Sequence, residues 1–315
     1  MSFRQPPSII TDKRVVLIVN PRSAQGRWLR NPKLRAYFHR RLPGRVFDQM
    51  ADKAGMIEQA RRLSLENDVL IVLGGDGTLA DVMQGVFEAG RQKDVLLGII
   101  PFGSGNALRK SLLIPKRLKA ALKVLSRGEP RTIDLIDLDG RVASFVSIGA
   151  TGKATHRKTQ SHIPGLAGHL LAATGLLVQP RKPFEIELFD GKDDAGRPFV
   201  HKKLCLKLFD CVINKTNHFG YSWLIAPKAR IDDGLLDVTL FDIRAFNYFL
   251  SFPLIYMGHY QKILKHFKAR RVIVRGPSLF VQYNGEILDE RRELELRVLP
   301  KAVRVIVPPR HAKIL

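Results

Sequence analysis

The sequence predicts an α/β protein in which an N-terminal parallel-sheet domain is followed by a β-rich, sandwich-like domain. In the first half of the chain, strand-like runs of aliphatic residues alternate with helical segments, which is the order of a parallel sheet covered by helices. After about residue 135, short runs are separated by turns rich in Asp, Gly and Pro, as in antiparallel β-structure. A chain of 315 residues is also long enough for two domains of ordinary size.

Three runs of β-branched and aliphatic residues predict the buried strands of the parallel sheet. These runs lie at 14–20, 68–73 and 95–101, and each ends at or next to a Pro or Gly that stops the strand. Helical segments are expected to follow them, up to about residue 39, over 78–90, and near 104–112 and 116–126. This alternation predicts a sheet with its helices packed on its faces.

Short runs in the second half of the chain predict the strands of the antiparallel domain. They lie at 141–148, 183–189, 203–213, 235–241, 271–274, 279–283, 293–298 and 303–307. Helices are expected to interrupt them near 165–178 and 244–266. We place the two domains at 1–136 and 137–315, with the last strand free to return to the first domain.

The charge balance predicts attraction to polyanions. Lys and Arg number 52 against 29 Asp and Glu, which gives a formal net charge of +23. Nucleic acid, anionic phospholipid and nucleotide phosphates are all candidate partners for such a chain. A solvated basic face without a partner explains the same excess equally well.

Cysteine usage and hydropathy favour a cytoplasmic protein without a membrane span. The two cysteines, Cys205 and Cys211, form no disulfide framework and no CxxC pair, which favours a reducing compartment. The most apolar segment, 165–178, is shorter than the roughly 20 residues that a helix needs to cross a bilayer. We therefore expect a cytoplasmic protein that is soluble or lies peripherally on the inner face of the membrane.

The strongest chemical signal is the glycine-rich loop Gly74-Gly75-Asp76-Gly77-Thr78, between a predicted strand and a predicted helix. Glycines let backbone amides approach phosphate oxygens closely, and the helix N-terminus adds a positive dipole. Asp76 is placed to orient amides, water or a metal, and Thr78 offers a hydroxyl. Taken alone, the same pattern also describes an ordinary turn that caps a helix.

Two further loops of small and polar residues follow the other two predicted strands. One begins Asn20-Pro21-Arg22-Ser23, and the other contains Ser104 and Asn106. Ligands of open α/β sheets bind outside the carboxyl ends of the strands, so three such loops predict a phosphate-binding site at that edge. The chain has no Walker lysine motif and no HRD or DFG motif, which excludes P-loop nucleotidases and protein kinases.

These loops, with three later segments, resemble the diacylglycerol kinase catalytic domain family, which includes bacterial lipid kinases, sphingosine kinases and ceramide kinases. The matching segments are the loops that begin at 20, 74 and 101, RTID at 131–134, APKARIDDGLLDV at 226–238 and NGE at 284–286. They follow the family's order from about residue 14 to about residue 290. The resemblance implies an ATP-dependent lipid kinase that uses Mg²⁺.

The resemblance also implies a role for each matched position. The nucleotide would be held by Asn20, Pro21, Arg22, Ser23, Gly74, Gly75, Gly77, Thr78, Ser104 and Asn106. Glu286 would act as the general base on the lipid hydroxyl, and Asp76 and Asp134 would belong to the acidic network near the catalytic magnesium. Asp233, with the backbone carbonyls of Arg230 and Leu235, would form a second-domain metal site. Phosphoryl transfer depends chiefly on positioning and charge neutralisation, so these groups are chemically sufficient.

Two positions depart from the family pattern at the implied site. Ala107 stands where the family has an aspartate after the third loop, and Asn284 stands where it has an aspartate two residues before the implied base. The first change removes one carboxylate from the acidic network.

A lipid acceptor is favoured by the positive charge and by two apolar segments. Residues 165–178 suit a channel or an interface, and 245–267 mixes aromatic residues with Lys262, Lys265 and His266, as interfacial helices do. Each segment also fits a plain core helix. NAD kinases share GGDGT but lack the other matched segments, so a soluble nucleotide acceptor is the weaker interpretation.

The alternative from another class is a protein that keeps the kinase fold, has lost activity and binds anionic membrane or nucleic acid. No nucleic acid is expected, because no RNA-binding motif with aromatic platforms is present. The expected partners are therefore a lipid substrate and an anionic membrane surface. We expect the active site in a cleft between the two domains, assembled by hinge closure.

Overall fold

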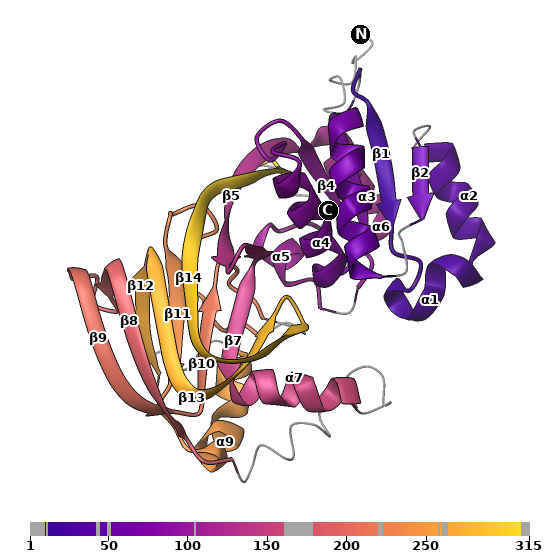
Figure 1. The fold of residues 1–315 in the computed structure, drawn as a ribbon. Helices are drawn as coiled ribbons and strands as arrows, with labels where there is room; N and C mark the ends of the chain where they lie inside the picture. The colour runs from indigo at the N-terminus through magenta and orange to yellow at the C-terminus, as the bar shows by residue number, and fades with distance from the viewer. Residues whose placement is uncertain are drawn as a thin grey trace. The chain divides into compact units, whose positions relative to one another are not determined.

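The structure, a computed structural model, divides the chain into two compact units (Figure 1). It describes residues 10, 12–41, 45–48, 52–103, 105–160, 179–219, 223–257, 259 and 264–309. The first unit combines Met1–Ile133 with Lys301–Leu315, and the second is Asp134–Pro300. The last residues of the chain thus belong with the N-terminal unit.

The first unit is built on a parallel sheet. Its strands are β1 (Val15–Val19), β2 (Arg45–Asp48), β3 (Val69–Gly74), β4 (Leu96–Pro101) and the end of β14 (Glu286–Val307). They lie in the order β2-β1-β3-β4-β14, and every neighbouring pair in this series is parallel. The three predicted strands are confirmed as β1, β3 and β4, whereas β2 was not predicted. The final strand joins the sheet where Arg304 and Val305 pair with Leu96 and Leu97.

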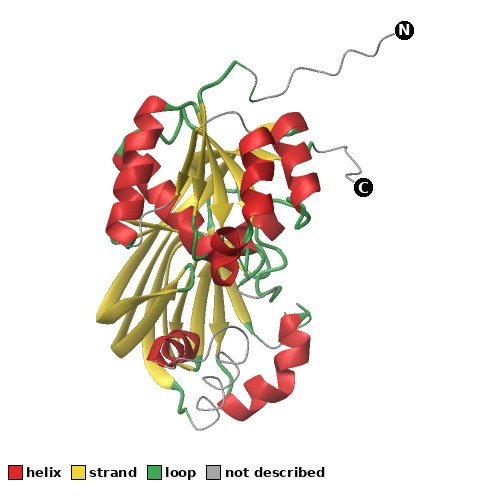
Figure 2. Ribbon diagram, turned by 90° about the vertical axis from the view of Figure 1, so that its right-hand side faces the viewer, coloured by secondary structure: helices red, strands yellow, loops and turns green. Residues whose placement is uncertain are grey.

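Helices cover both faces of this sheet (Figure 2). On one face, α1 (Ser23–Arg30), α2 (Pro32–Arg41) and α6 (Leu118–Arg127) enclose a core in which Trp28 and Phe38 pack against alternate residues of β1 and β3. Helices α3 (Lys53–Glu66) and α4 (Asp76–Glu88) pack against each other and against β3. Their close approach requires Gly85, where a Cβ would lie 2.4 Å from the Ile57 carbonyl oxygen.

The second unit is an antiparallel, closed sheet, in agreement with the predicted sandwich-like domain. Its further elements are β5 (Glu129–Leu138), β6 (Arg141–Ala143), β7 (Phe145–Gly149), α7 (Ala150–Gln160), β8 (Lys182–Asp193), β9 (Pro198–Leu208), β10 (Asp210–Asn214), β11 (Leu236–Phe241), α9 (Ala245–Tyr256), β12 (Lys265–Ala269) and β13 (Arg271–Tyr283). Strand β13 pairs with β8 through its first half and with β7 through its second half. Because β7, β10, β11, β12 and β8 are consecutive neighbours, β13 completes a ring around the apolar core.

Several predicted boundaries in the second unit are wrong. The run 203–213 contains two strands, β9 and β10, and the runs 271–274 and 279–283 form the single strand β13, bent by a bulge between Arg275 and Leu279. The runs 293–298 and 303–307 likewise belong to one strand, β14. A bulge interrupts the apolar alternation of a strand but does not end its backbone pairing. The sequence pattern therefore predicts two short strands where the structure has one long strand.

The predicted helix over 244–266 is also wrong in its second half. Helix α9 ends at Tyr256, and β12 begins at Lys265, where it pairs with Leu240 of β11. Lys265 and His266 therefore lie on a strand, because cross-strand pairing overrides the local helical pattern. The other predicted helix of this half, 165–178, lies outside the described residues. Among the residues that the structure describes, no helix is long and apolar enough to cross a membrane.

A buried carboxyl group joins β10 to the start of α7. Asp210 accepts hydrogen bonds from the Thr151 hydroxyl, from the Thr151 amide at 2.9 Å and from the Cys211 amide at 3.0 Å. Burial raises the pKa of Asp210 to about 7, and the bonds from Thr151 and Cys211 oppose the rise. The folded state therefore holds a proton on Asp210 at pH values where an unfolded chain, with a pKa of about 4, does not.

This pKa shift predicts a pH-dependent contribution to stability. Between pH of about 4 and 7 the folded state binds more protons at Asp210 than the unfolded state, so this contribution to the free energy of unfolding falls as the pH rises. Asp210→Asn, which keeps an acceptor oxygen, should lose this dependence. Urea unfolding measures the free energy of unfolding of both proteins. The difference between wild type and the variant should favour wild type more at pH 5 than at pH 8. A difference that does not change with pH would contradict the raised pKa.

Candidate functional site

The three predicted loops of the first unit lie side by side because their strands are neighbours. β3 lies between β1 and β4, and all three run parallel, so their carboxyl ends share one edge of the sheet. The loops after Val19, Gly74 and Pro101 therefore form one contiguous surface. This is the position at which open α/β sheets bind ligands.

Asn20 links the first loop to the second. Its side-chain Nδ2 donates to the Thr78 hydroxyl at 2.8 Å, and its backbone amide donates to the Leu73 carbonyl at 3.2 Å. Its Oδ1 accepts from the Arg22 amide at 2.9 Å, which shapes the turn through Pro21 into α1. Ser23 is the first residue of that helix. Asn20 thus positions the loop by using both ends of its side-chain amide.

Two glycines of the second loop are required by close contacts. A Cβ on Gly74 would lie 2.5 Å from the Thr78 Cβ, so the Thr78 side chain occupies that space. Gly75 and Gly103 approach so closely that a Cβ on Gly103 would lie 2.5 Å from the Gly75 Cα. Gly75 also caps α4 without a side-chain acceptor, and Gly77 follows in its first turn. This arrangement leaves the helix N-terminus available to an anion such as a phosphate.

Asp76 fixes the third loop against the second. Its Oδ2 accepts from the Ala107 amide at 3.0 Å, and its Oδ1 accepts from the Leu108 amide at 3.3 Å. Burial raises the pKa of Asp76, and these two amides oppose the rise. Of the roles considered for Asp76, the structure places it as an organiser of amides, since both carboxylate oxygens bind backbone N–H groups.

Asn106 forms the sharp entry into α5 (Ala107–Ser111). Its backbone is left-handed, with φ of 56°, a conformation that Asn tolerates better than most residues. Its Nδ2 donates to the Gly103 carbonyl at 2.6 Å and closes the loop. Ser104, the remaining predicted contact of this loop, lies outside the described residues.

Two basic residues next to the third loop were not singled out from the sequence. Arg109 and Lys110 lie on α5, and burial lowers the pKa of Lys110, with the neighbouring Arg109 adding to the effect and Asp76 opposing it. Their position in the sequence could have identified them, because they follow the predicted contact Asn106 by three and four residues. They give this edge of the sheet a local positive charge.

In the second unit, the predicted metal ligands are brought together around a different cation. The Lys215 ammonium donates to the Arg230 carbonyl at 2.8 Å, to Asp233 Oδ1 at 2.8 Å and to the Leu235 carbonyl at 2.6 Å. Asp134 Oδ2 lies 3.2 Å from the same nitrogen. The three ligands expected for the second-domain site therefore do not fit a metal ion, because Lys215 Nζ occupies the centre of the set, and Asp134, expected near the catalytic magnesium, lies beside the same nitrogen. Sequence reasoning missed Lys215, and its signal was a lysine directly after the predicted strand run 203–213 and Asn214.

Glu286 follows a tight hairpin turn between β13 and β14. Asn284 and Gly285 both have positive φ, of 50° and 90°, and Tyr283 pairs with Glu286 across the two-residue loop. An Asn-Gly pair suits such a turn because both residues tolerate left-handed backbone. Glu286 is half-buried at the first position of β14.

Asn284 has a structural reason to replace the family's aspartate. Its Oδ1 accepts from the Ser144 amide and hydroxyl at 2.9 and 3.0 Å, while its Nδ2 donates to the Val142 carbonyl at 3.2 Å. An aspartate at this position has no hydrogen to donate to that carbonyl. The buried amide of Asn284 therefore anchors the hairpin that carries Glu286.

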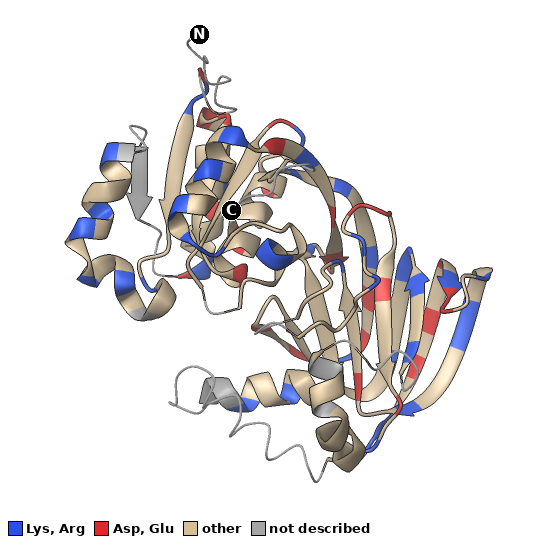
Figure 3. Cartoon of the chain, turned by 180° about the vertical axis from the view of Figure 1, so that it is seen from behind, with Lys and Arg blue, Asp and Glu red and all other residues tan. Residues whose placement is uncertain are grey.

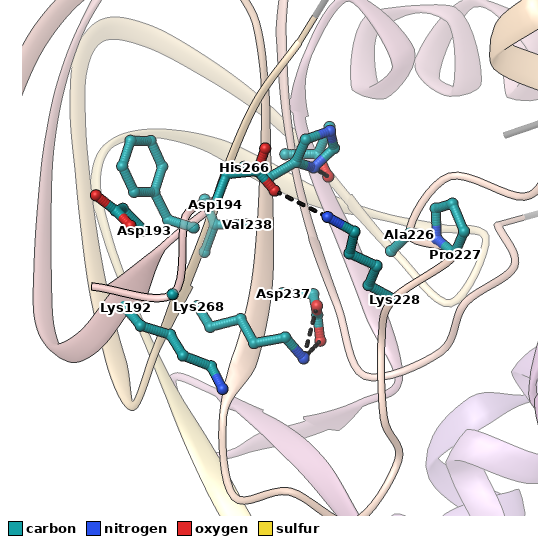
Figure 4. Close-up of a pocket in the computed structure, with 13 residues that line it drawn as sticks. Lys192, Asp193, Asp194, Ala226, Pro227, Lys228, Asp237, Val238, His266 and Lys268 are labelled. Carbon is teal, nitrogen blue, oxygen red and sulfur yellow. Dashed lines mark hydrogen bonds and ion pairs between the residues drawn. The ribbon is translucent and has the colours of Figure 1, made fainter. Parts of the chain in front are cut away.

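A pocket of about 230 Å³ lies elsewhere in the second unit (Figure 4). Lys228 pairs there with Asp194 at 3.4 Å, and Lys268 pairs with Asp237 at 3.0 Å. Burial raises the pKa of Asp237 to about 6, and Lys268 opposes the rise. None of the predicted site residues lines this pocket, and these two lysines are neutralised by carboxylates. It is therefore a weaker candidate for phosphate than the three loops of the first unit.

The contact between Gly75 and Gly103 predicts that Gly103→Ala weakens nucleotide binding at least tenfold. The added Cβ meets backbone and forces the second and third loops apart. Gly98→Ala, on the strand β4 that leads into this loop, is the matched control, because its Cβ would meet side chains most closely, Leu125 at 2.6 Å and Ile71 at 3.2 Å. Equilibrium binding of a fluorescent ATP analogue compares the two variants with wild type. Equal weakening by both variants would indicate a general loss of stability.

Comparison with known proteins identifies the two halves of the chain. Residues 14–138 match the diacylglycerol kinase catalytic domain, and residues 201–307 match the YegS C-terminal NAD kinase beta sandwich-like domain. A diacylglycerol kinase from Mycobacterium tuberculosis is 30% identical over 288 residues, which cover 86% of this chain and 88% of the relative. A protein named "Probable lipid kinase YegS-like" from Shewanella frigidimarina is 24% identical over 249 residues, 76% of each chain.

A solved structure agrees with the fold. The crystal structure of a diacylglycerol kinase from Bacillus anthracis superimposes with a TM-score of 0.68 at 20% identity, covering 95% of this chain and 99% of that one. The two matched domains and the relative that is 30% identical confirm the family resemblance found in the sequence motifs. The chain belongs to the diacylglycerol kinase family, with the catalytic domain of that family followed by a YegS-type C-terminal domain.

Proposed function

We propose that the protein is an ATP-dependent lipid kinase that transfers the γ-phosphate to the hydroxyl of a diacylglycerol or a sphingoid base. The observation that carries the proposal is the interlocking of the three loops in the first unit. Asn20 binds Thr78, Gly75 contacts Gly103, and Asp76 binds the amides of the third loop. These contacts support a rigid cradle of backbone amides for phosphate oxygens.

We propose that Mg²⁺ arrives with the nucleotide. Among the described residues, no group of three or more His, Cys, Asp and Glu side chains is arranged to hold a metal ion. Mg²⁺ commonly binds substrate phosphates with only one or two protein carboxylates, and it would neutralise the charge that develops during transfer. The loops of the first unit hold and orient the phosphates in this scheme. Asp76 acts as a positioning residue, because its oxygens organise the amides of the third loop.

Glu286 is proposed as the general base on the lipid hydroxyl. The hairpin turn and the buried Asn284 hold its backbone in one place, which a base needs if it is to meet a proton at a defined distance. Its carboxylate takes the proton of the lipid hydroxyl as that oxygen attacks the γ-phosphate. As the new P–O bond forms, the bond from the γ-phosphorus to the oxygen that bridges the β- and γ-phosphates breaks, and ADP leaves with that oxygen.

Glu286→Gln should lower turnover by roughly 10²-fold or more, because the amide cannot accept the proton. Glu290→Gln, the same change at an exposed position of the same strand, is the matched control and should retain activity. Transfer of labelled γ-phosphate to a panel of lipids in mixed micelles measures both, with ATP binding checked in parallel.

Labelled lipid that disappears only in the Glu286 variant would establish the kinase and its acceptor class. Substantial turnover by Glu286→Gln would remove Glu286 from the base role. ATP binding without any labelled lipid would favour the alternative, an inactive kinase fold that binds anionic membrane.

The exposed face of α9 supports a lipid acceptor and a membrane partner. Four apolar side chains recur at helical spacing, and their exposed fractions are 70% for Phe246, 72% for Leu250, 43% for Leu254 and 52% for Met257. The opposite face carries Tyr248, which packs on Phe209 and Phe241. The helix has no charged residue, in contrast to the basic residues spread over both units (Figure 3). An apolar face on a basic protein suits insertion into an anionic leaflet.

Leu250→Glu should weaken binding to vesicles that contain anionic phospholipid by roughly tenfold, since it places a charge in the apolar face of α9. The matched control is Leu113→Glu, which changes an exposed leucine of the first unit. Vesicle sedimentation at low and high salt measures the affinity, and binding should weaken as salt rises. If both variants weaken binding equally, α9 is not the contact surface.

A further inference from the structure

Lys215 is a lysine whose side chain is fully buried, which is unusual for a charged residue. It follows β10 directly, its relative exposure is 1%, and its side chain is fully enclosed. Among the residues that the structure describes, the other largest fully buried side chains are apolar, for example Trp28 and Phe38. A charged group reaches such a position only where polar partners replace the water that it gives up.

The partners of Lys215 complete its hydrogen bonding. Its three N–H donors have three acceptors within 2.8 Å: the carbonyls of Arg230 and Leu235 and the carboxylate of Asp233. Asp134 adds a second negative charge at 3.2 Å. The ammonium is therefore surrounded by four oxygens, two from carbonyl groups and two from carboxylates.

The segment 230–235 is folded around this ammonium. It contains no helix or strand, and it turns at Gly234, where φ is 70°. Asp134 holds the same segment through its backbone, by donating to the Ile231 carbonyl at 2.8 Å, and through its side chain, by accepting from the Gly234 amide at 2.7 Å. The carbonyls of Arg230 and Leu235 point inward because a cation attracts both of them.

A second lysine, Lys268, pairs with Asp233 of this cluster and with the neighbouring Asp237. Lys268 donates to Asp233 Oδ2 at 2.7 Å and to Asp237 Oδ2 at 3.1 Å, so Asp233 bridges the two ammonium groups. Lys268 also lines the pocket of the second unit, where Figure 4 shows it directed at Asp237. Lys215 is the enclosed cation of the pair, and Lys268 is the partly exposed one.

We propose that the Lys215 ammonium is a built-in cation that takes the place of a metal ion in the second unit. Two carbonyls and two carboxylates are the oxygen donors that a hard cation prefers, but Mg²⁺ and Ca²⁺ need such oxygens at roughly 2.0–2.6 Å from their own centre. That centre is occupied by Nζ. The segment 230–235 therefore keeps its fold without a bound metal. The fold of this segment is independent of the proposed kinase activity, and hydrogen exchange and thermal unfolding follow it without an activity assay.

The wild-type protein provides the first test. Hydrogen exchange of the peptide that spans 230–236 should be the same in EDTA as in millimolar Mg²⁺ or Ca²⁺, without nucleotide. The Gly234 and Leu235 amides, which donate to Asp134 and Asp233, report directly on this segment. A loss of protection in EDTA that either metal restores would overturn the proposal.

A pair of variants tests whether the surrounding oxygens form a cation site. Lys215→Ala removes the ammonium and leaves room beside the four oxygens, whereas Lys215→Met removes the charge and keeps most of the volume. Both should lower the midpoint of thermal unfolding by on the order of 10 °C, because the carboxylates lose a buried partner. Ca²⁺, Mg²⁺ or K⁺ should restore part of the loss in Lys215→Ala and none of it in Lys215→Met.

Three outcomes of the variant experiment would overturn the proposal. They are unchanged unfolding midpoints in both variants, equal recovery of both variants with added cation, and a destabilised Lys215→Ala that no cation restores. If neither variant folds, the exchange experiment on the wild-type protein still decides the question.

Discussion

The parallel pairing of β1, β3 and β4 is the constraint on which the candidate nucleotide site depends. Parallel neighbours end at the same edge of a sheet, so the chain leaves all three strands on one side. The middle strand carries the glycine-rich loop, and this loop is therefore the one that contacts both others. Every interaction between the loops, from Asn20 with Thr78 to Asp76 with the third loop, follows from that placement.

Each unit contains a buried ionisable side chain that polar partners stabilise, but the partners differ. In the first unit, the carboxylate of Asp76 accepts hydrogen bonds from backbone amides of the third loop and so keeps that loop in place. In the second unit, Lys215 is stabilised by carbonyl and carboxylate oxygens. Both groups shape a segment that has little regular structure of its own. A buried charge is costly unless it is paired, and the pairing is what makes the surrounding backbone specific.

The two units have different surfaces, each suited to a different requirement of a lipid kinase. A rigid, glycine-lined edge suits a nucleotide, because phosphates are recognised by backbone amides that must approach closely. An antiparallel sheet closed on itself encloses an apolar core and leaves α9 with an exposed apolar face. Asn284 shows how a departure from the family pattern can be structural, since its amide supplies a donor that an aspartate lacks.

Much of the first unit could be predicted from local patterns. Continuous aliphatic runs predicted β1, β3 and β4, and Gly75 and Gly103 lie where backbone approaches backbone. The order of strands and helices was enough to place the three loops at one edge, because right-handed connections in parallel sheets leave few alternatives. Strand β2 escaped prediction because its residues lack a continuous aliphatic run.

The second unit depended more on contacts between residues distant in sequence. The pairing of β12 with β11 changed half of a predicted helix into a strand, and the two partners of β13 were invisible in its apolar pattern. The sequence by itself determined the family, the fold class and the three loops that meet at one edge of the sheet, because these follow from local motifs in a fixed order. Only the tertiary structure decided that Lys215 lies among the predicted metal ligands, because its partners at Asp134 and Arg230–Leu235 meet it only after the chain has folded.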